Sequence, residues 1–231
     1  MKTIGMVGGT SWVSTLEYYR LLNQEIQRRL GGVESARCVL YSINFADLTR
    51  LKDQDPEQRS VYPLVRDAAE RVAVAGADCL VICANTLHMF AAELARDVAL
   101  PLVHIGAATA GEIRGAGLHT VGLLGTRPTM ERDFYRRALA DAGIAMLVPG
   151  DADREFIDAA ILGEMVRGVF RPEVKQRFLS IMQELAGHGA QGIVMGCTEI
   201  PLLIDNEDTG IRLFDTLAIH VRAAVDFALA P

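Results

Sequence analysis

Two cysteines stand where an apolar run of residues gives way to small polar ones. Cys83 opens the segment Cys-Ala-Asn-Thr after one such run, and Cys197 lies in Gly-Cys-Thr-Glu after another. A thiol can act as a general acid or base near neutral pH when polar neighbours or a helix N-terminus lower its pKa. Two thiols that approach one carbon atom from opposite sides could invert its configuration, because one removes a proton and the other returns one. Taken singly, each cysteine would more often be a small packed residue.

A weak internal repeat relates the two cysteines. A Gly-Thr pair ends an apolar run at Thr10 and again at Thr126, and each pair is followed nine residues later by Tyr-Arg. Cys83 lies 73 residues after the first threonine (83 − 10), and Cys197 lies 71 residues after the second (197 − 126). We therefore expect two similar halves that each present one cysteine at the same place.

The chain alternates between strand-like and helix-like patterns, which indicates an α/β protein with mostly parallel sheets. Strands are expected at Thr3–Val7, Cys38–Ile43, Cys79–Cys83, Leu102–Ile105, Thr120–Leu124, Ala145–Val148 and Ile193–Met195. Helices are expected at Ser14–Leu30, Gln58–Ala75, Met89–Asp97, Ala107–Ala116, Thr129–Ala142, Asp153–Arg167, Pro172–His188 and Thr216–Leu229. Ser14 and Glu17 fit a capping box at the start of the first helix. Four glycines are placed to end later helices, namely Gly76, Gly117, Gly143 and Gly189.

We expect two pseudo-symmetric α/β domains, one formed by residues 1–104 and 214–231 and the other by residues 105–213. The first carries Cys83 and the second carries Cys197. Ligands of open parallel sheets bind beyond the carboxyl ends of the strands. Thr10, Thr126 and the two cysteines all follow such ends, so they are expected to converge on a cleft between the halves.

The composition argues against several classes of function. The chain has 231 residues, half of them hydrophobic, and its net charge of −6 argues against a nucleic-acid partner. No apolar stretch approaches the roughly 20 residues that span a bilayer, and no Cys/His cluster has zinc spacing. The Gly8–Thr10 segment lacks the spacing of a phosphate-binding loop. We therefore expect a cytoplasmic protein with reduced thiols, no bound metal and no membrane partner.

Four segments, in the order IGMVGGTSW, CANTLH, LLGTRPTMERDFY and MGCTEIPLL, resemble the cofactor-independent aspartate/glutamate racemase family. The resemblance covers nearly the whole chain and is strongest to the aspartate racemase and broad-specificity amino-acid racemase branch. It implies two flavodoxin-like domains with the active site between them, and usually a homodimer. It also implies racemisation of a small-molecule amino acid without pyridoxal phosphate or any other cofactor.

The resemblance further implies roles for individual residues. Cys83 and Cys197 are the two acid/base residues, the first taking the proton from the D-enantiomer and the second from the L-enantiomer. Residues beside them and in the Gly-Thr turns contact the substrate: Thr10, Ser11, Ala84, Asn85, Thr86, Thr126, Thr198 and Glu199. Glu199 could equally stabilise the start of the helix that follows it.

Departures from the family pattern leave the substrate open. Many relatives read Gly-Gly-Met-Ser-Trp-Glu-Ser where this chain has Thr10 and Val13. Relatives often carry a threonine at the place of Ala84 and an aspartate at the place of Ala107. The arginine and lysine motifs that meet the distal carboxylate in aspartate-specific relatives are missing from the sequence. The nearest candidate cations for that group are Arg50, Lys52 and Arg167.

Four alternatives stand beside the amino-acid racemase. A hydantoin racemase or maleate isomerase would keep both cysteines, a related decarboxylase typically keeps one, and a silent homologue would bind a ligand without reaction. Cys38, Cys79 and His104 are expected to be core residues. The remaining histidines form no evident constellation: His88, His119, His188 and His220.

Overall fold

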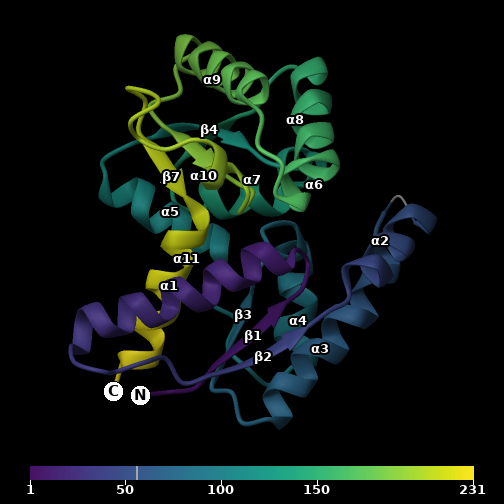
Figure 1. The fold of residues 1–231 in the computed structure, drawn as a ribbon, viewed down its shortest axis with the longest axis vertical. Helices are drawn as coiled ribbons and strands as arrows, with labels where there is room; N and C mark the ends of the chain where they lie inside the picture. Colours follow the sequence, from purple (N-terminus) through teal and green to yellow (C-terminus); the bar gives the residue numbers. More distant parts are fainter. Residues whose placement is uncertain (56) are drawn as a thin grey trace. The chain divides into compact units, whose positions relative to one another are not determined.

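The computed structural model describes residues 1–55 and 57–231 and contains two separate sheets (Figure 1). The chain divides into two compact units, residues 1–104 with 220–231 and residues 105–219. Every strand pair in the two sheets, within the described residues, is parallel. The expected α/β class with parallel sheets is therefore confirmed. The return to the first unit falls at residue 220, inside the last helix, whereas the sequence suggested residue 214.

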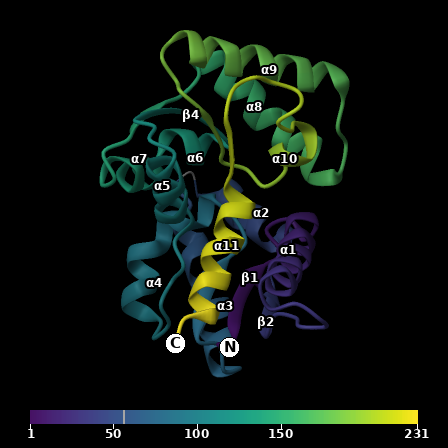
Figure 2. The ribbon, with the colours of Figure 1, turned by 90° about the vertical axis from the view of Figure 1, so that its left-hand side faces the viewer.

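The first unit is built on a three-stranded sheet with the order β2-β1-β3. Its strands are β1 (Ile4–Gly8), β2 (Cys38–Ser42) and β3 (Cys79–Ile82). Its helices are α1 (Trp12–Leu30), α2 (Phe45–Gln54), α3 (Tyr62–Val74) and α4 (Ala91–Asp97), with short 3-10 segments η1 (Arg59–Val61) and η2 (Thr86–Phe90). The last helix, α11 (Thr216–Leu229), ends here. The N–H of Lys2 donates to the carbonyl of Ala228 over 2.9 Å, so the two termini lie side by side (Figure 2).

The core of the first unit follows from its apolar patterns. Strands β1 and β3 are buried at every position, as expected of strands covered on both faces. Helix α3 places Val65 and Val72 in the same buried cluster as Leu80 of β3. Helix α1 buries Tyr18 and Leu22, four positions apart, and leaves much of its other side exposed.

The second unit has a four-stranded sheet with the order β5-β4-β6-β7. Its strands are β4 (Thr120–Leu124), β5 (Ala145–Leu147), β6 (Ile193–Met195) and β7 (Leu213–Asp215). Its helices are α5 (Ile105–Gly115), α6 (Arg127–Glu131), α7 (Asp133–Ala140), α8 (Asp151–Gly163), α9 (Pro172–Gly187) and α10 (Ile200–Leu203), with a 3-10 segment η3 (Met165–Arg167).

The second sheet packs on both of its faces. Val121 and Leu123 of β4 belong to a buried cluster with Tyr135 of α7. Leu124, the next residue along β4, belongs to a different cluster with Phe178 of α9. Successive side chains of a strand point to opposite faces, so the helices α7 and α9 lie on opposite sides of this sheet.

The two sheets share the order in which their strands pair. In each unit the first strand lies between the second and the third, as β2-β1-β3 and as β5-β4-β6. Strand β7 then extends the second sheet beside β6. Among the described residues, the matching place beside β3 holds a single parallel bridge, between Leu80 and Leu102. The strand expected at Leu102–Ile105 is therefore wrong, because the chain turns into α5 at Ile105 after that one bridge.

The expected capping box at the start of the first helix is also wrong. Helix α1 begins at Trp12, and the hydroxyl oxygen of Ser11 accepts a hydrogen bond from the N–H of Ser14 over 3.4 Å. Glu17 pairs with Arg20 at 2.7 Å and does not reach back to the cap. The glycines expected to end helices have positive φ, which confirms them: Gly76, Gly117, Gly143 and Gly189.

Other differences are local. The helix expected at Thr129–Ala142 is two helices, α6 and α7, because the backbone at Arg132 is extended. Helix α2 and strand β7 were not expected.

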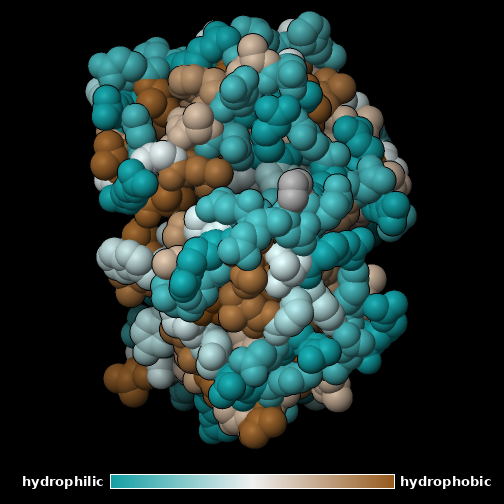
Figure 3. All heavy atoms as spheres, turned by 90° about the vertical axis from the view of Figure 1, so that its right-hand side faces the viewer, coloured by the Kyte–Doolittle hydropathy of each residue, from teal (hydrophilic) through white to brown (hydrophobic). Residues whose placement is uncertain are grey.

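Within the described residues, no helix combines the length and the apolar character needed to cross a membrane. The face drawn in Figure 3 is largely hydrophilic, with hydrophobic residues in smaller groups.

Candidate active site

The turn after β1 places Thr10 and Ser11 at the carboxyl end of the first sheet. Gly9 has a φ of +83°, and a Cβ at this position would come within 2.0 Å of the carbonyl oxygen of Ile43, so only glycine fits the turn. The N–H of Gly9 donates to Oγ1 of Thr15 over 2.9 Å, and that hydroxyl donates to the carbonyl of Ser11 over 2.8 Å. The side chain of Thr15 therefore holds the turn and the start of α1 together.

Cys83 lies immediately after β3, against this turn. Its N–H donates to the carbonyl of Val7 over 2.9 Å, and its own carbonyl accepts from Oγ1 of Thr10 at 3.5 Å. The side chain is fully buried. Burial raises the pKa of the Cys83 thiol, with a smaller contribution from Cys38, so this thiol is protonated at neutral pH. The following residues, Ala84–Thr86, lead into η2, and Asn85 is buried.

The turn after β4 places Thr126 at the carboxyl end of the second sheet, where it begins α6. Its hydroxyl lies 3.2 Å from Oγ1 of Thr129. The next residue, Arg127, donates its N–H to a carboxylate oxygen of Asp158 over 2.7 Å. This bond ties the Thr126 turn to helix α8.

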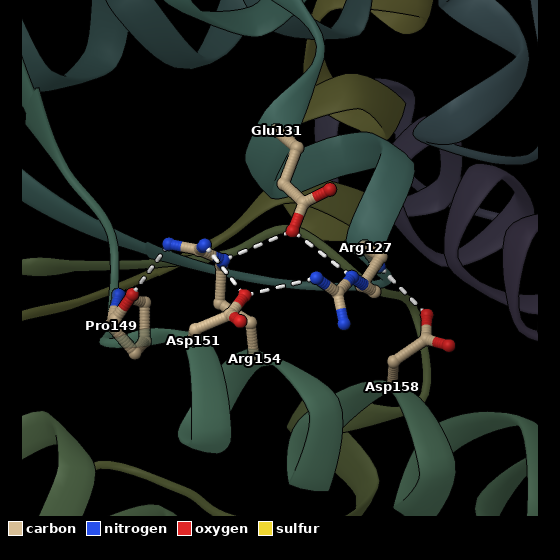
Figure 4. A network of polar contacts seen from close by, with 6 residues as sticks. All are labelled: Arg127, Glu131, Pro149, Asp151, Arg154 and Asp158. Atoms are coloured by element: carbon tan, nitrogen blue, oxygen red, sulfur yellow. Dashed lines mark hydrogen bonds and ion pairs between the residues drawn. The ribbon is translucent and has the colours of Figure 1, made fainter.

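Ion pairs surround that bond (Figure 4). Arg127 lies 3.0 Å from Glu131 and 2.9 Å from Asp151, and Arg154 lies 3.1 Å and 2.9 Å from the same two carboxylates. The side chains are partly or largely exposed, so each pair is worth only about 0–1 kcal/mol. The network balances the charge of Arg127 and joins α6 to α8.

Cys197 differs from Cys83 in its partner. Its thiol donates to Oε2 of Glu199 over 3.0 Å, and the hydroxyl of Thr198 donates to the same oxygen over 2.9 Å. Glu199 is only 2% exposed, and none of the described residues gives its Oε1 a hydrogen bond. Burial, and next the charge of Glu199, raise the pKa of the Cys197 thiol well above its ordinary value. Cys197 is thus a protonated thiol held against a carboxylate.

The two cysteines do not occupy matching positions, contrary to the expectation from the repeat. Ile82 pairs with Val7, and Cys83 follows directly; Met195 pairs with Leu124, but Gly196 follows and Cys197 comes one residue later. A Cβ at residue 196 would lie 2.8 Å from the carbonyl oxygen of Leu124, so a side chain does not fit there. Cys197 thus lies one residue further beyond its strand than Cys83 does. The two residues also differ in exposure, since Cys83 is buried and Cys197 is partly exposed.

The chain resembles known proteins over most of its length. Residues 7–224 match the family model described as Asp/Glu/Hydantoin racemase. The chain belongs to this family. The family is described as one of racemases, a class of isomerase, so the resemblance of the sequence segments is confirmed.

Several members of the family resemble the chain over nearly its whole length. The broad specificity amino-acid racemase RacX of Bacillus subtilis is 23% identical over 98% of both chains. A crystal structure from Yersinia pestis is 41% identical with a TM-score of 0.90, and an aspartate racemase homologue from Pyrococcus horikoshii OT3 is 32% identical with a TM-score of 0.83; each covers 100% of both chains.

The structure brings some of the predicted residues of this racemase-family member together within each unit, whereas the hydroxyl of Thr126 lies beside Thr129. In the first unit Thr10 contacts the Cys83 loop, and Ser11 caps the adjoining helix. In the second unit Thr198 and Glu199 contact one another beside Cys197. The candidate cations lie elsewhere: Arg50 pairs with Asp47 on α2, Lys52 lies on the same helix, and Arg167 is exposed in η3. These cations belong to α2 and η3 and not to the strand-end loops that carry the thiols.

Sequence reasoning missed residues that hold the two loops. Thr15 and Asp158 accept hydrogen bonds from the backbone of the Thr10 and Thr126 turns. Neither residue has a spacing that would have singled it out. Cys38, the first residue of β2, is partly exposed and not the core residue that was expected. Cys79, the first residue of β3, is buried as expected, and burial raises its pKa to about 11.

Proposed function

We propose that this protein is an amino-acid racemase in which Cys83 and Cys197 act as a pair of acid/base groups without pyridoxal phosphate. The observation that supports the pair most directly is that each parallel sheet carries one cysteine just beyond its third strand, next to the turn that holds Thr10 or Thr126. Family membership supports the reaction class.

The proposed reaction exchanges one proton at each face of the substrate Cα. A thiolate on one cysteine removes the α-proton and becomes a thiol, leaving a carbanion next to the substrate carboxylate. The thiol of the other cysteine then donates its proton to the opposite face and becomes a thiolate. The product is the mirror-image amino acid, and the protonation states of the two cysteines have been exchanged. The scheme requires the two thiols to reach one Cα from opposite sides.

One thiol must lose its proton before the reaction can start. Burial raises the pKa of both thiols, so we propose that the thiolate forms when the substrate binds. The ammonium group of an amino acid brings a positive charge that favours a nearby thiolate. We infer that Glu199, with its carboxylate buried, receives that ammonium or the proton of Cys197.

The remaining predicted residues are proposed to hold the substrate. The hydroxyls and N–H groups just before or at the starts of α1, η2, α6 and α10 suit a carboxylate, and they come from Thr10, Ser11, Ala84, Asn85, Thr86, Thr126 and Thr198. Lys52 and Arg167 are the candidates for binding a distal carboxylate of the substrate.

Because the relatives include a broad-specificity racemase and an aspartate racemase homologue, we propose aspartate, glutamate or a broader set of amino acids as substrates. The mechanism needs reduced thiols, which the cytoplasm provides.

A panel of enantiopure amino acids in deuterated water tests this proposal. We expect inversion, followed by chiral chromatography, to be accompanied by replacement of the α-proton with solvent deuterium in the absence of pyridoxal phosphate. Absence of both across acidic, apolar and basic amino acids would contradict it. The panel includes a hydantoin, because the family description names hydantoin racemases, and reaction of the hydantoin alone would support that second function.

We also propose that the protein forms a homodimer through helix α1. Trp12, Leu16 and Tyr19 are 70%, 56% and 50% exposed and line one shallow hollow with Leu40 of β2. Strand β2 is at the edge of its sheet, where unpaired backbone groups favour an added partner. Large exposed apolar residues gathered in this way favour contact with another protein surface.

A further inference from the structure

A cluster of three histidines, two of them buried and His104 partly exposed, contacts the loop that carries Cys83. The ring of His88 meets the ring of His104 with centroids 5.0 Å apart and the ring of His220 with centroids 5.3 Å apart, both edge-on. His88 and His220 are essentially inaccessible to solvent. The three residues are far apart in the sequence, which is why their spacing showed no constellation.

Hydrogen bonds determine which nitrogen of two rings carries the proton. Nδ1 of His88 lies 2.9 Å from the carbonyl of Ala84, which can only accept, so Nδ1 is the donor. Nε2 of His220 likewise donates to the carbonyl of Val103 over 2.7 Å, and its Nδ1 accepts from the hydroxyl of Tyr18 over 2.8 Å. Burial and the neighbouring histidines hold the pKa of His88 well below its ordinary value, and burial lowers the pKa of His220 to about 4. Both rings are neutral at physiological pH.

The cluster joins three distant parts of the first unit. His104 is the last residue before the chain leaves this unit, and His220 is the first residue after it returns. His88 packs against both rings, and its N–H holds the carbonyl of the residue that directly follows Cys83. The ring of His88 therefore connects the Cys83 loop to both segments by which the chain passes between its units.

A packing role alone does not explain an imidazole at this place. Among the described residues, no group forms a hydrogen bond with Nε2 of His88. Buried polar atoms are normally hydrogen-bonded, and leaving one without a partner is unfavourable. An apolar side chain of similar size would avoid that cost but would lose the hydrogen bond from Nδ1 to the Ala84 carbonyl, which favours histidine here.

We propose that His88 is a positioning residue for Cys83, an inference that rests on the proposed role of Cys83 in racemisation. The Nδ1–H of His88 fixes the Ala84 carbonyl and with it the direction of the preceding thiol. His104 and His220 hold the ring of His88 in one orientation. Displacement of a reacting group by about 1 Å can cost on the order of 10²-fold in rate, so the loop needs such a support.

Two substitutions at residue 88 separate the effect of the hydrogen-bond donor of His88 from the effect of its side-chain volume. His88→Leu keeps a bulky side chain and removes the donor, whereas His88→Asn places an amide N–H close to where Nδ1 was. His188→Leu is the matched control, because His188 is exposed at the end of α9. We would measure kcat and KM for racemisation, and the rates at which iodoacetamide modifies Cys83 and Cys197, resolved by peptide mass spectrometry.

We expect His88→Leu to lower kcat by about 10–10²-fold with little change in KM, and to speed modification of Cys83 but not of Cys197. His88→Asn should recover most of both properties. The proposal would be overturned in favour of simple packing if His88→Leu and His88→Asn lowered kcat equally. It would also be overturned if the modification rates of Cys83 and Cys197 changed equally. If His88→Leu fails to fold, His88→Gln replaces it, because the amide of glutamine lies one bond further from the backbone than that of asparagine. Equal kcat values and equal Cys83 modification rates in the Gln and Asn variants would then overturn the proposal.

The modification rates do not depend on racemase activity. Failure of the proposed function would appear as an unsubstituted protein that inverts no substrate, while Cys83 still responds to His88. Failure of the inference would appear as an active racemase whose Cys83 is modified at the same rate in His88→Leu as in the unsubstituted protein.

Discussion

The thiol of Cys197 donates a hydrogen bond to Oε2 of Glu199 over 3.0 Å, in a site where that carboxylate is almost fully buried. A negative charge next to a thiol disfavours the thiolate, so Glu199 adds to the effect of burial and raises the pKa of Cys197. Burial also raises the pKa of the Cys83 thiol, with a smaller contribution from Cys38. Burial is thus the main reason that both thiols are protonated, and the charge of Glu199 acts on Cys197 in addition.

Removal of the Glu199 charge should make Cys197 more acidic. In Glu199→Gln the amide keeps the shape of the side chain, and the pKa of Cys197 should fall while remaining above that of a free thiol, since burial is the larger cause and persists. The pH profile of iodoacetamide modification at Cys197 should move to lower pH, with the profile of Cys83 unchanged. Glu131→Gln, a partly exposed glutamate on α6, is the control. An unchanged or rising profile at Cys197 would contradict the assigned role of the charge.

Loss of either thiol should stop inversion. Cys83→Ala and Cys197→Ala each remove one of the two groups that exchange a proton with Cα, and positioned acid/base groups typically contribute about 10²–10⁴-fold in rate. We expect racemisation to fall by at least that much in each variant, measured by chiral chromatography. Cys38→Ala, at the start of β2, should remain active. Full activity in either single variant would exclude the two-thiol scheme.

Much of this arrangement could be predicted from the sequence because local patterns determine it. The strands at Thr120–Leu124 and Ile193–Met195 and the helix at Thr216–Leu229 have the bounds that were expected. Their apolar runs and the glycines after earlier helices are signals that depend on neighbouring residues alone. The same local signals identified Cys83 and Cys197 as following the ends of strands.

What the sequence did not show depends on contacts between distant residues. The offset between Cys83 and Cys197 is visible only in the pairing of Ile82 with Val7 and of Met195 with Leu124. The cluster of His88 and His220 likewise depends on tertiary packing. The capping prediction failed because Ser11 and Ser14 both suit an N-cap, and the position of the turn after β1 decided between them.

The hydroxyl of Thr15 should contribute to stability through the turn that carries Thr10. Thr15→Val preserves the shape of the side chain but leaves the buried N–H of Gly9 without its acceptor, which typically costs about 1–3 kcal/mol. We expect a lower urea midpoint with an unchanged m-value. Thr49→Val is the control, because Oγ1 of Thr49 donates only to the Phe45 carbonyl of its own helix among the bonds described. Equal losses in the two variants would show that the Gly9 bond carries no special weight.

A charge on the exposed side of α1 should separate the proposed dimer. Leu16→Glu places a carboxylate among the apolar side chains of Trp12, Tyr19 and Leu40, and burying an unpaired charge there would cost more than the apolar contact returns. Light scattering coupled to size-exclusion chromatography should report twice the chain mass of 25.1 kDa for the unsubstituted protein and a single chain mass for the variant. Val74→Glu, on the exposed end of α3, should leave the dimer intact. A monomeric unsubstituted protein, or an undisturbed dimer in Leu16→Glu, would show that this face of α1 is not the interface.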